Sequence, residues 1–237
     1  MTTKAGLDFD SFEWLTFDCY GTLIDWETGI WDAFKPILES HRVRLSSEQI
    51  LELYGRLEAE LESENHEYMT YRDVLAQVVV ALGRKLGFVP DTQEVQLLPN
   101  SLSSWKPFPD TVDALRKLKQ KYKLGIISNT DDDFFANSAK HLQVAFDEVV
   151  TAQQARSYKP ALNNFRIAIQ RIGVPKTKIL HVAQSIYHDV IPARAMGLTS
   201  VWVNRRGPGK GAGATKPAAG RPDLEVPDLQ TLAAMAC

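Results

Sequence analysis

The stretch that decides the fold spans residues 13–26 and reads EWLTFDCYGTLIDW. An apolar and aromatic run ends on a single acid, Asp18, and a turn follows at Gly21. A short run that is mostly apolar on both faces is typical of a strand buried in a parallel sheet. The sequence therefore predicts a buried strand at 16–20 that presents the carboxylate of Asp18, with Tyr20 two positions later.

Four similar runs follow along the chain, with helical stretches between them. The further strands are expected at 123–129, 148–152, 178–184 and 199–204, and the helices at 110–122, 131–142, 161–173 and 185–197. Each expected helix carries apolar residues at helical spacing. Strands that alternate with helices in this way indicate an α/β fold with a doubly wound parallel sheet.

Residues 30–99 interrupt this alternation, because they contain three or four helical stretches and no convincing strand. One of these helices is expected to begin at Thr70, which caps it together with Asp73, and to end at Gly87. We therefore expect a helical cap domain inserted after the first strand. The expected boundaries are 30–99 for the cap and 1–29 with 100–237 for the core.

Two features of the expected cap have simple structural explanations. The acidic, amphipathic stretch 46–67 is interpreted as a solvated helix face rather than as a metal site. Several aromatic residues are candidates for the wall of an apolar pocket under the cap, although ordinary packing explains them equally well. They are Trp26, Trp31, Tyr54, Tyr68 and Tyr71.

The composition narrows the class of protein. With 27 Lys and Arg against 29 Asp and Glu, the formal net charge is −2, so no basic face for a nucleic acid is expected. The longest apolar stretch, 74–82, is too short to span a bilayer, and the first ten residues lack the apolar core of a secretory signal. Cys19 and Cys237 make no disulfide framework, which fits a reducing cytosol. We expect a cytoplasmic protein.

The stretch 205–223 is rich in Gly, Pro and Ala. It lacks the GK[ST] ending and the following helix that a phosphate-binding loop requires. We expect a mobile surface flap.

Polar side chains lie at or just beyond the ends of four of the expected strands, at the edge where a doubly wound sheet gathers its ligands. They are Asp18, Tyr20 and Thr22 at the first strand, Ser128 and Asn129 at the second, Lys159 in the loop after the third, and Gln184, Ser185 and Asp189 at the fourth. Each alone has an ordinary explanation, such as a turn or a helix start. Packing does not explain polar residues at all four strand ends together, so the sequence predicts a site for a small molecule at this edge.

These residues resemble the motifs of the haloacid dehalogenase superfamily of hydrolases. FDCYGTL (17–23) resembles its first motif, IISN (126–129) its second, the lysine of SYKP (157–160) its third, and VAQSIYHD (182–189) its fourth. The match extends over nearly the whole chain, and the helical insertion lies where this family carries its small cap. The resemblance implies a Rossmann-like core and a nucleophilic Asp18 that forms a covalent ester with the substrate.

Two departures from these motifs indicate a branch of the superfamily. Most members are magnesium-dependent phosphatases, in which a second acid, two positions after the first, protonates the leaving alkoxide. Tyr20 stands there instead, and Gln184 replaces the acid that holds magnesium, a cation that favours carboxylate oxygens. Tyrosine at this position resembles the 2-haloacid dehalogenases, whose halide leaving group needs no proton. The resemblance therefore implies hydrolysis of short 2-haloalkanoic acids without a metal or another cofactor.

The resemblance also implies catalytic roles. The expected catalytic residues are Asp18, Lys159, Asp189 and Ser128. Lys159 holds Asp18 ionised and in place, while Asp189 activates the water that hydrolyses the ester. Ser128 stabilises the oxyanion or binds the substrate carboxylate.

Further residues are expected to bind the substrate. These are Tyr20, Thr22, Asn129 and Ser185. Thr22 shares the role of Ser128, Asn129 contacts the leaving halide, and Ser185 orients Lys159 or Asp189. The resemblance also suggests a homodimer.

Some points stay open at this stage. The best-known dehalogenases carry an arginine in the first cap helix that helps to hold the halide, and the register of Arg56 does not settle whether it matches. His188 is either a proton shuttle or a structural histidine. Two other functions are alternatives: a magnesium-dependent phosphatase acting on a small phosphate ester, and a catalytically idle binding protein.

Overall fold

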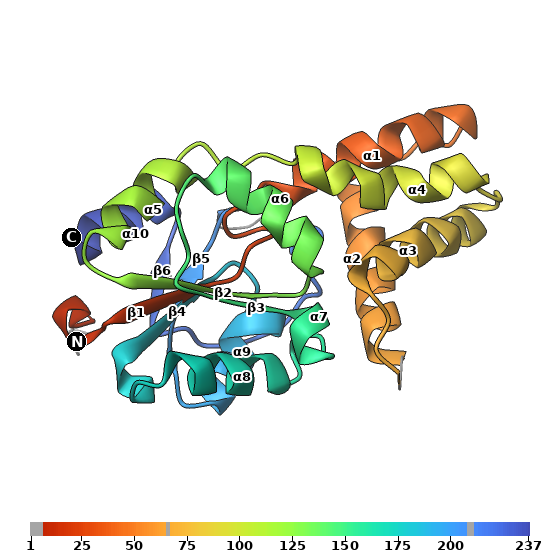
Figure 1. Ribbon diagram of the computed structural model, residues 1–237. Helices are drawn as coiled ribbons and strands as arrows, with labels where there is room; N and C mark the ends of the chain where they lie inside the picture. The colour runs from red at the N-terminus through yellow and green to blue at the C-terminus, as the bar shows by residue number, and fades with distance from the viewer. Residues whose placement is uncertain (1–6, 65–66, 208–210) are drawn as a thin grey trace.

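A six-stranded parallel sheet forms the centre of the core domain in the computed structural model, which describes residues 7–64, 67–207 and 211–237 (Figure 1). The strands are β1 (Trp14–Phe17), β2 (Lys123–Ser128), β3 (Glu148–Thr151), β4 (Ile179–Ala183), β5 (Thr199–Val203) and β6 (Leu224–Val226). Their order in the sheet is β3-β2-β1-β4-β5-β6, and every neighbouring pair is parallel. The carboxyl end of β1 therefore opens between those of β2 and β4.

Helices cover both faces of the sheet, with α5, α6 and α10 on one side and α8 and α9 on the other (Figure 1). The helices of the core are α5 (Thr111–Lys119), α6 (Asp132–Leu142), α7 (Ala152–Ala155), α8 (Asn163–Ile172), α9 (Ile191–Ala195) and α10 (Leu229–Ala236). Shorter helical turns are η1 (Phe9–Ser11), η2 (Leu102–Ser104), η3 (Lys176–Lys178) and η4 (Ile186–Val190). The predicted doubly wound α/β fold is confirmed.

The helical cap after the first strand is also confirmed, and it lies beyond the carboxyl ends of the strands (Figure 1). Its helices are α1 (Trp26–Ser40), α2 (Ser47–Glu64), α3 (Tyr71–Leu86) and α4 (Thr92–Ser101). The predicted ends of α3 are correct, because the hydroxyl of Thr70 accepts a hydrogen bond from the N–H of Asp73 and Gly87 ends the helix with φ +83°. The expected boundary at residue 30 lies inside α1.

Several predictions of secondary structure were wrong. The first strand covers 14–17 and not 16–20, so Asp18 and Tyr20 follow it instead of lying in it, and the short helix α7 was not expected. The short strand β6 was missed, since it has only three residues and follows a segment rich in Gly and Pro. The single helix expected at 185–197 is a π-helical turn, η4, followed by α9. Pro192 has no N–H to donate to the carbonyl of His188, so one α-helical hydrogen bond is missing where η4 meets α9.

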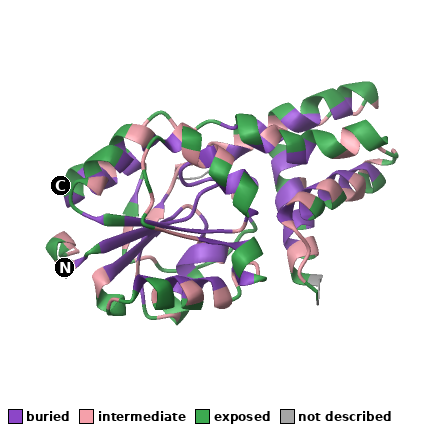
Figure 2. Ribbon diagram, in the orientation of Figure 1, coloured by how far each residue is buried: buried purple, intermediate pink, exposed green. Residues whose placement is uncertain are grey.

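The core lies between the sheet and its covering helices, and the central strands β1 and β4 are buried along their whole length (Figure 2). Leu15, Phe17, Leu124 and Val182 are fully buried strand residues of one apolar cluster. This packing holds the strand ends in place, and the next side chains along the chain form the site. Among the described residues, no helix combines the length and apolarity needed to cross a membrane.

Candidate active site

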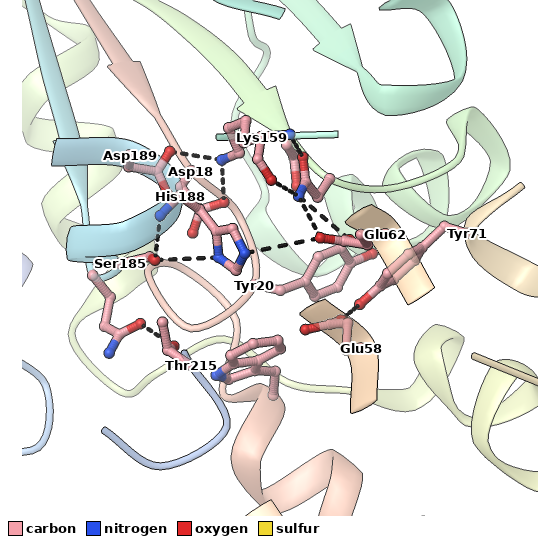
Figure 3. Close-up of a pocket in the computed structure, with 14 residues that line it drawn as sticks. Asp18, Tyr20, Glu58, Glu62, Tyr71, Lys159, Ser185, His188, Asp189 and Thr215 are labelled. Atoms are coloured by element: carbon pink, nitrogen blue, oxygen red, sulfur yellow. Dashed lines mark hydrogen bonds and ion pairs between the residues drawn. The ribbon is translucent and has the colours of Figure 1, made fainter. Parts of the chain in front are cut away.

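Asp18 comes directly after β1, and its side chain points into a cavity between the sheet edge and the cap (Figure 3). The hydroxyl of Thr22 donates to Oδ2 at 2.7 Å, and the ammonium of Lys159 donates to Oδ1 at 2.9 Å. The turn between Asp18 and Thr22 requires Gly21, because the φ of this residue is +86° and a Cβ would lie 2.8 Å from the indole nitrogen of Trp26. Burial raises the pKa of Asp18, and Lys159 and Thr22 oppose that rise.

Lys159 is a buried cation that joins two carboxylates. Its Nζ donates to Oδ1 of Asp18 at 2.9 Å, to Oδ1 of Asp189 at 2.6 Å and to the carbonyl oxygen of Ile127 at 2.8 Å. An ammonium group has three donors, so all of them are engaged. Burial alone would lower the pKa of Lys159, but the two carboxylates outweigh it and raise the pKa. Lys159 therefore positions both acids and is not a proton acceptor.

Asp189, in η4, lines the cavity and has one carboxylate oxygen without a hydrogen-bond partner in the described structure. Oδ1 accepts from Lys159 and from Nε2 of His181 at 3.0 Å, whereas Oδ2 is buried without a partner among the described residues. Burial would raise the pKa of Asp189, but Lys159 and His181 outweigh it, so the pKa lies below its usual value. Nδ1 of His181 is 2.9 Å from the hydroxyl of Thr16, which fits an Nε2–H tautomer donating to Asp189. The free Oδ2 can accept a proton from a water molecule.

The polar residues near β1 and β2 differ in what their polar atoms contact. Ser128 lines the cavity, and its buried hydroxyl has no hydrogen-bond partner in the described part of the chain. Asn129 fixes the peptide of Lys159, since Oδ1 accepts from its N–H at 2.7 Å and Nδ2 donates to its carbonyl at 3.0 Å. The hydroxyl of Tyr20 pairs with that of Ser138 at 2.9 Å. Ser128 is therefore the member of this group with a free polar atom.

Ser185 was expected to orient Lys159 or Asp189, but its hydroxyl is hydrogen-bonded to His188 and to neither of these residues. Its hydroxyl accepts from the N–H of His188 at 2.9 Å and lies 3.2 Å from Nδ1 of the same residue. This leaves Nε2 of His188 as the ring nitrogen that faces the cavity, without a hydrogen bond in the described structure. Burial lowers the pKa of His188 to about 4, so the ring is neutral near pH 7.

The loop 205–223 also contributes to the site, which the interpretation as a surface flap did not foresee. Thr215 is buried, lines the cavity and donates from its hydroxyl to Oε1 of Gln184 at 3.1 Å. Arg206 ties the loop to the cap through Glu27 and through Glu48, whose carboxylate oxygens lie 2.5 and 2.6 Å away. Residues 208–210 of the expected flap lie outside the described residues.

The cap contributes acids to the cavity, so the interpretation of residues 46–67 as a solvated face is wrong for two positions. Glu58 is 3% exposed and the side chain of Glu62 is 5% exposed, and both face the cavity (Figure 3). Both are four residues apart on the stripe of α2 that also contains Tyr54, a spacing that could have revealed them. Arg56 is exposed on the other side of α2 and does not line the cavity.

The cavity is small, about 30 Å³, which suits a substrate of a few non-hydrogen atoms. Of the eight residues expected at the site, seven line the cavity. Thr22 does not line it, but its hydroxyl donates to Asp18. Trp26 and Tyr71, two of the candidate aromatic residues, also line it. The lining residues are Asp18, Tyr20, Trp26, Glu58, Glu62, Tyr71, Ser128, Asn129, Lys159, Gln184, Ser185, His188, Asp189 and Thr215.

Comparison with known proteins gives consistent matches over most of the chain. A family model described as haloacid dehalogenase-like hydrolase matches residues 15–203. An (S)-2-haloacid dehalogenase of Pseudomonas fluorescens is 27% identical over 198 residues, 80% of this chain and 83% of that protein. Haloacetate dehalogenase H-2 of a Moraxella species is 28% identical over 201 residues, 82% of this chain and 87% of that protein. The crystal structure of a defluorinating L-2-haloacid dehalogenase superposes with a TM-score of 0.79 at 22% identity, covering 99% of both chains.

Proposed function

The chain belongs to the family of haloacid dehalogenase-like hydrolases, and on this premise we propose that it hydrolyses the carbon–halogen bond of short 2-haloalkanoic acids. One observation carries the choice of leaving group. Tyr20 occupies the position two residues after Asp18, and its hydroxyl is engaged by Ser138. Burial also raises the pKa of Tyr20 far above its usual value, so its phenol is a poor proton donor. A halide suits this site because it departs without a proton.

In the first step, the carboxylate of Asp18 attacks the α-carbon of the substrate on the side opposite the halogen. A carbon–oxygen bond forms, the carbon–halogen bond breaks, and its electron pair leaves with the halide. Lys159 and Thr22 each hold one oxygen of Asp18, so the nucleophile is oriented before the substrate arrives. The burial of Asp18 removes water that would otherwise solvate the carboxylate.

In the second step, water attacks the carbonyl carbon of the ester on Asp18. Oδ2 of Asp189 accepts a proton from that water, because it is the oxygen of Asp189 left without a partner in the described structure. Asp189 gives that proton to the departing alkoxide as the ester breaks, so the product is a 2-hydroxy acid. The second proton of the water passes to solvent when the carboxylate of Asp18 is restored. The ammonium of Lys159 and the hydroxyl of Thr22 donate to the oxyanion formed on the way.

The residues present do not fit the magnesium ion that phosphatases of this superfamily use. Asp18 and Asp189 are both bound to Lys159, and Oε1 of Gln184 already accepts from Thr215. Nowhere in residues 7–64, 67–207 and 211–237 do three or more His, Cys, Asp or Glu side chains gather in an arrangement able to hold a metal ion. No step of the proposed mechanism involves a metal.

Further support comes from the relatives, which are named for activity on 2-haloacids and haloacetate. The test is release of free halide from fluoroacetate, chloroacetate and both enantiomers of 2-chloropropionate, measured with a chelator and separately with magnesium. We expect release that survives the chelator and disappears in Asp18→Asn. Magnesium-dependent cleavage of a generic phosphate ester, with no halide from any substrate, would contradict the proposal and favour a phosphatase. Silence in both assays would favour a binding protein.

A further inference from the structure

Glu58 and Glu62 are two nearly buried carboxyl groups that the proposed mechanism does not use. They lie one helical turn apart on α2 and face the cavity from the cap, opposite Asp18 and Lys159 (Figure 3). Glu62 is within 3.3 and 3.4 Å of Nδ2 of Asn129 through its two oxygens. A pair of acids at this place is unexpected for a site that takes a carboxylate, and it requires an electrostatic explanation.

The charges around the cavity make an ionised pair costly. The other charged groups that face it are Asp18, Asp189 and Lys159. No arginine is among the described residues that line the cavity. With both glutamates ionised, four carboxylates would surround one ammonium, and a haloacid would add a fifth. Carboxylates that line one small cavity repel each other strongly where water is largely excluded.

The neighbouring titratable groups do not supply the missing positive charge. The cation Lys216, whose charge helps to lower the pKa of His188, does not line the cavity. His188 faces Glu62, with Nε2 3.8 Å from Oε2, but its ring is neutral near pH 7. Tyr54 and Tyr71 are phenols whose pKa values burial raises well above the usual range, so they stay protonated. Tyr158 packs near Glu62 from the loop after α7, and burial likewise raises its pKa. The pair can lose its charge only by taking up protons.

The hydrogen bonds of Glu58 are compatible with a neutral acid. Oε1 accepts from the hydroxyl of Tyr54 at 2.6 Å and from that of Tyr71 at 2.5 Å. Oε1 can therefore act as the carbonyl oxygen, which leaves Oε2 to carry a proton toward the cavity. Burial raises the pKa of Glu58 to about 7 and that of Glu62 well above its usual value.

We propose that Glu58 and Glu62 are substrate-binding residues that receive the carboxylate of the haloacid as neutral acids, so that binding of the substrate is coupled to uptake of protons. This inference rests on the proposed function, because it identifies the group that recognises the acid end of that substrate. A protonated carboxyl donates a hydrogen bond to a carboxylate, and His188 Nε2–H offers a further donor beside it. The neutral acids of the cap then bind the substrate carboxylate through hydrogen bonds, in place of a positively charged residue.

The coupling predicts a dependence of KM on pH. At low pH the pair is neutral and the anion binds well. Above the pKa values of the pair, the glutamates must take up protons from solvent before the anion binds. Each such proton makes the KM for chloroacetate rise by about tenfold per pH unit. Chloroacetamide carries no charge, so its KM should change far less over the same range.

The decisive variants are Glu58→Gln and Glu62→Gln, because glutamine has the shape of the neutral acid and keeps a donor. Halide release from chloroacetate and chloroacetamide would be measured between about pH 6 and pH 9. We expect the variants to have a lower KM for chloroacetate than the wild type at high pH, and a flatter dependence of that KM on pH. Glu60→Gln, an exposed residue of the same helix, is the matched control and should behave as the wild type. A wild-type KM for chloroacetate that does not change with pH, or variants with a raised KM at every pH, would overturn the inference.

A binding measurement separates this inference from the proposed function. Titration calorimetry of the wild type with (S)-lactate, in two buffers of different ionisation enthalpy, counts the protons taken up on binding of a non-reactive carboxylate. We expect uptake of about one proton near pH 8 in the wild type and less in a double variant that combines Glu58→Gln with Glu62→Gln. Halide release without proton uptake would disprove the inference alone. Absence of halide from every substrate would disprove the proposed function. If, in addition, lactate did not bind or bound without uptake of protons, the inference would be disproved as well.

Discussion

Nζ of Lys159 donates to Oδ1 of Asp189 at 2.6 Å, and both side chains are 1% exposed. The same nitrogen donates to Asp18, so one buried cation sets the distance between the proposed nucleophile and the proposed base. A buried ion pair adds little net stability, but removal of one partner leaves an uncompensated charge. The arrangement therefore links the stability of the core to the geometry of the site.

Replacement of Lys159 by methionine should lower both stability and activity. Two buried carboxylates would lose their partner, so we expect the free energy of unfolding to fall by about 3–5 kcal/mol and halide release to be lost. Urea denaturation at neutral pH measures the first effect. Lys178→Met removes an exposed pair with Glu13 and should change stability by less than about 1 kcal/mol.

A second substitution distinguishes the lost charge balance from a simple packing defect. Asp189→Asn in the Lys159→Met background removes one of the two unpaired charges, so part of the lost stability should return. If the double variant is no more stable than the single variant, the loss does not come from the carboxylates.

Asp189→Asn alone should separate the two chemical steps. The amide cannot accept a proton from water, so the ester on Asp18 should form and persist. We expect a burst of about one halide per enzyme followed by turnover reduced at least ~100-fold. Rapid-quench halide measurement and intact-mass analysis report the burst and the ester. Undiminished steady turnover, or loss of the burst itself, would argue against Asp189 as the base of the second step.

Asp131 connects the core to the cap. Its carboxylate, just before α6, accepts from the N–H groups of Tyr71 and Arg72 at 3.0 and 2.9 Å, at the start of α3. The hydroxyl of Tyr68 donates to the same carboxylate at 3.1 Å. Asp131→Ala should therefore weaken the beginning of α3 by about 1–2 kcal/mol and raise KM, because the cap carries residues that face the substrate.

Limited proteolysis and steady-state kinetics test this contact. The cap of the Asp131→Ala variant should be cleaved faster than that of the wild type. Asp133→Ala is the control, because its side chain is 61% exposed and forms a surface pair with Arg72. Equal cleavage rates for the two variants would show that Asp131 does not hold the cap.

His188 should make the protein less stable in mild acid. Its pKa is about 4 in the folded state against 6.5 in the unfolded state, so between these values the unfolded chain binds a proton that the folded chain does not. Above pH 6.5 the ring is neutral in both states and does not lower the free energy of unfolding. As the pH falls from 6.5 toward 4, His188 lowers the free energy of unfolding by about 3 kcal/mol. His188→Gln should remove that part of the decrease, as measured by urea denaturation across this range. The same slope in the variant would contradict the assignment, and His141→Gln, on α6 away from the site, serves as control.

Much of the core was predictable because local patterns and topology agree. The five longer strands follow from short apolar runs, and the ends of α3 follow from Thr70 and Gly87. The missed strand β6 has three residues and depends on pairing with β5, which no local pattern reports. The π-helical turn η4 packs against β4 and β5, and no local pattern reports that packing.

The sequence by itself determined which core residues meet. Asp18, Ser128, Lys159 and Asp189 lie at or beyond the carboxyl ends of successive parallel strands, and such strands share one carboxyl edge, so chain order was enough to bring them together. Only the tertiary structure decided what covers them. The stripe of α2 that carries Glu58 and Glu62, and the loop that carries Thr215, are positioned by packing between segments far apart in the chain. Burial is a property of that packing, and it changes the protonation of an acid that its own helix would leave charged in water.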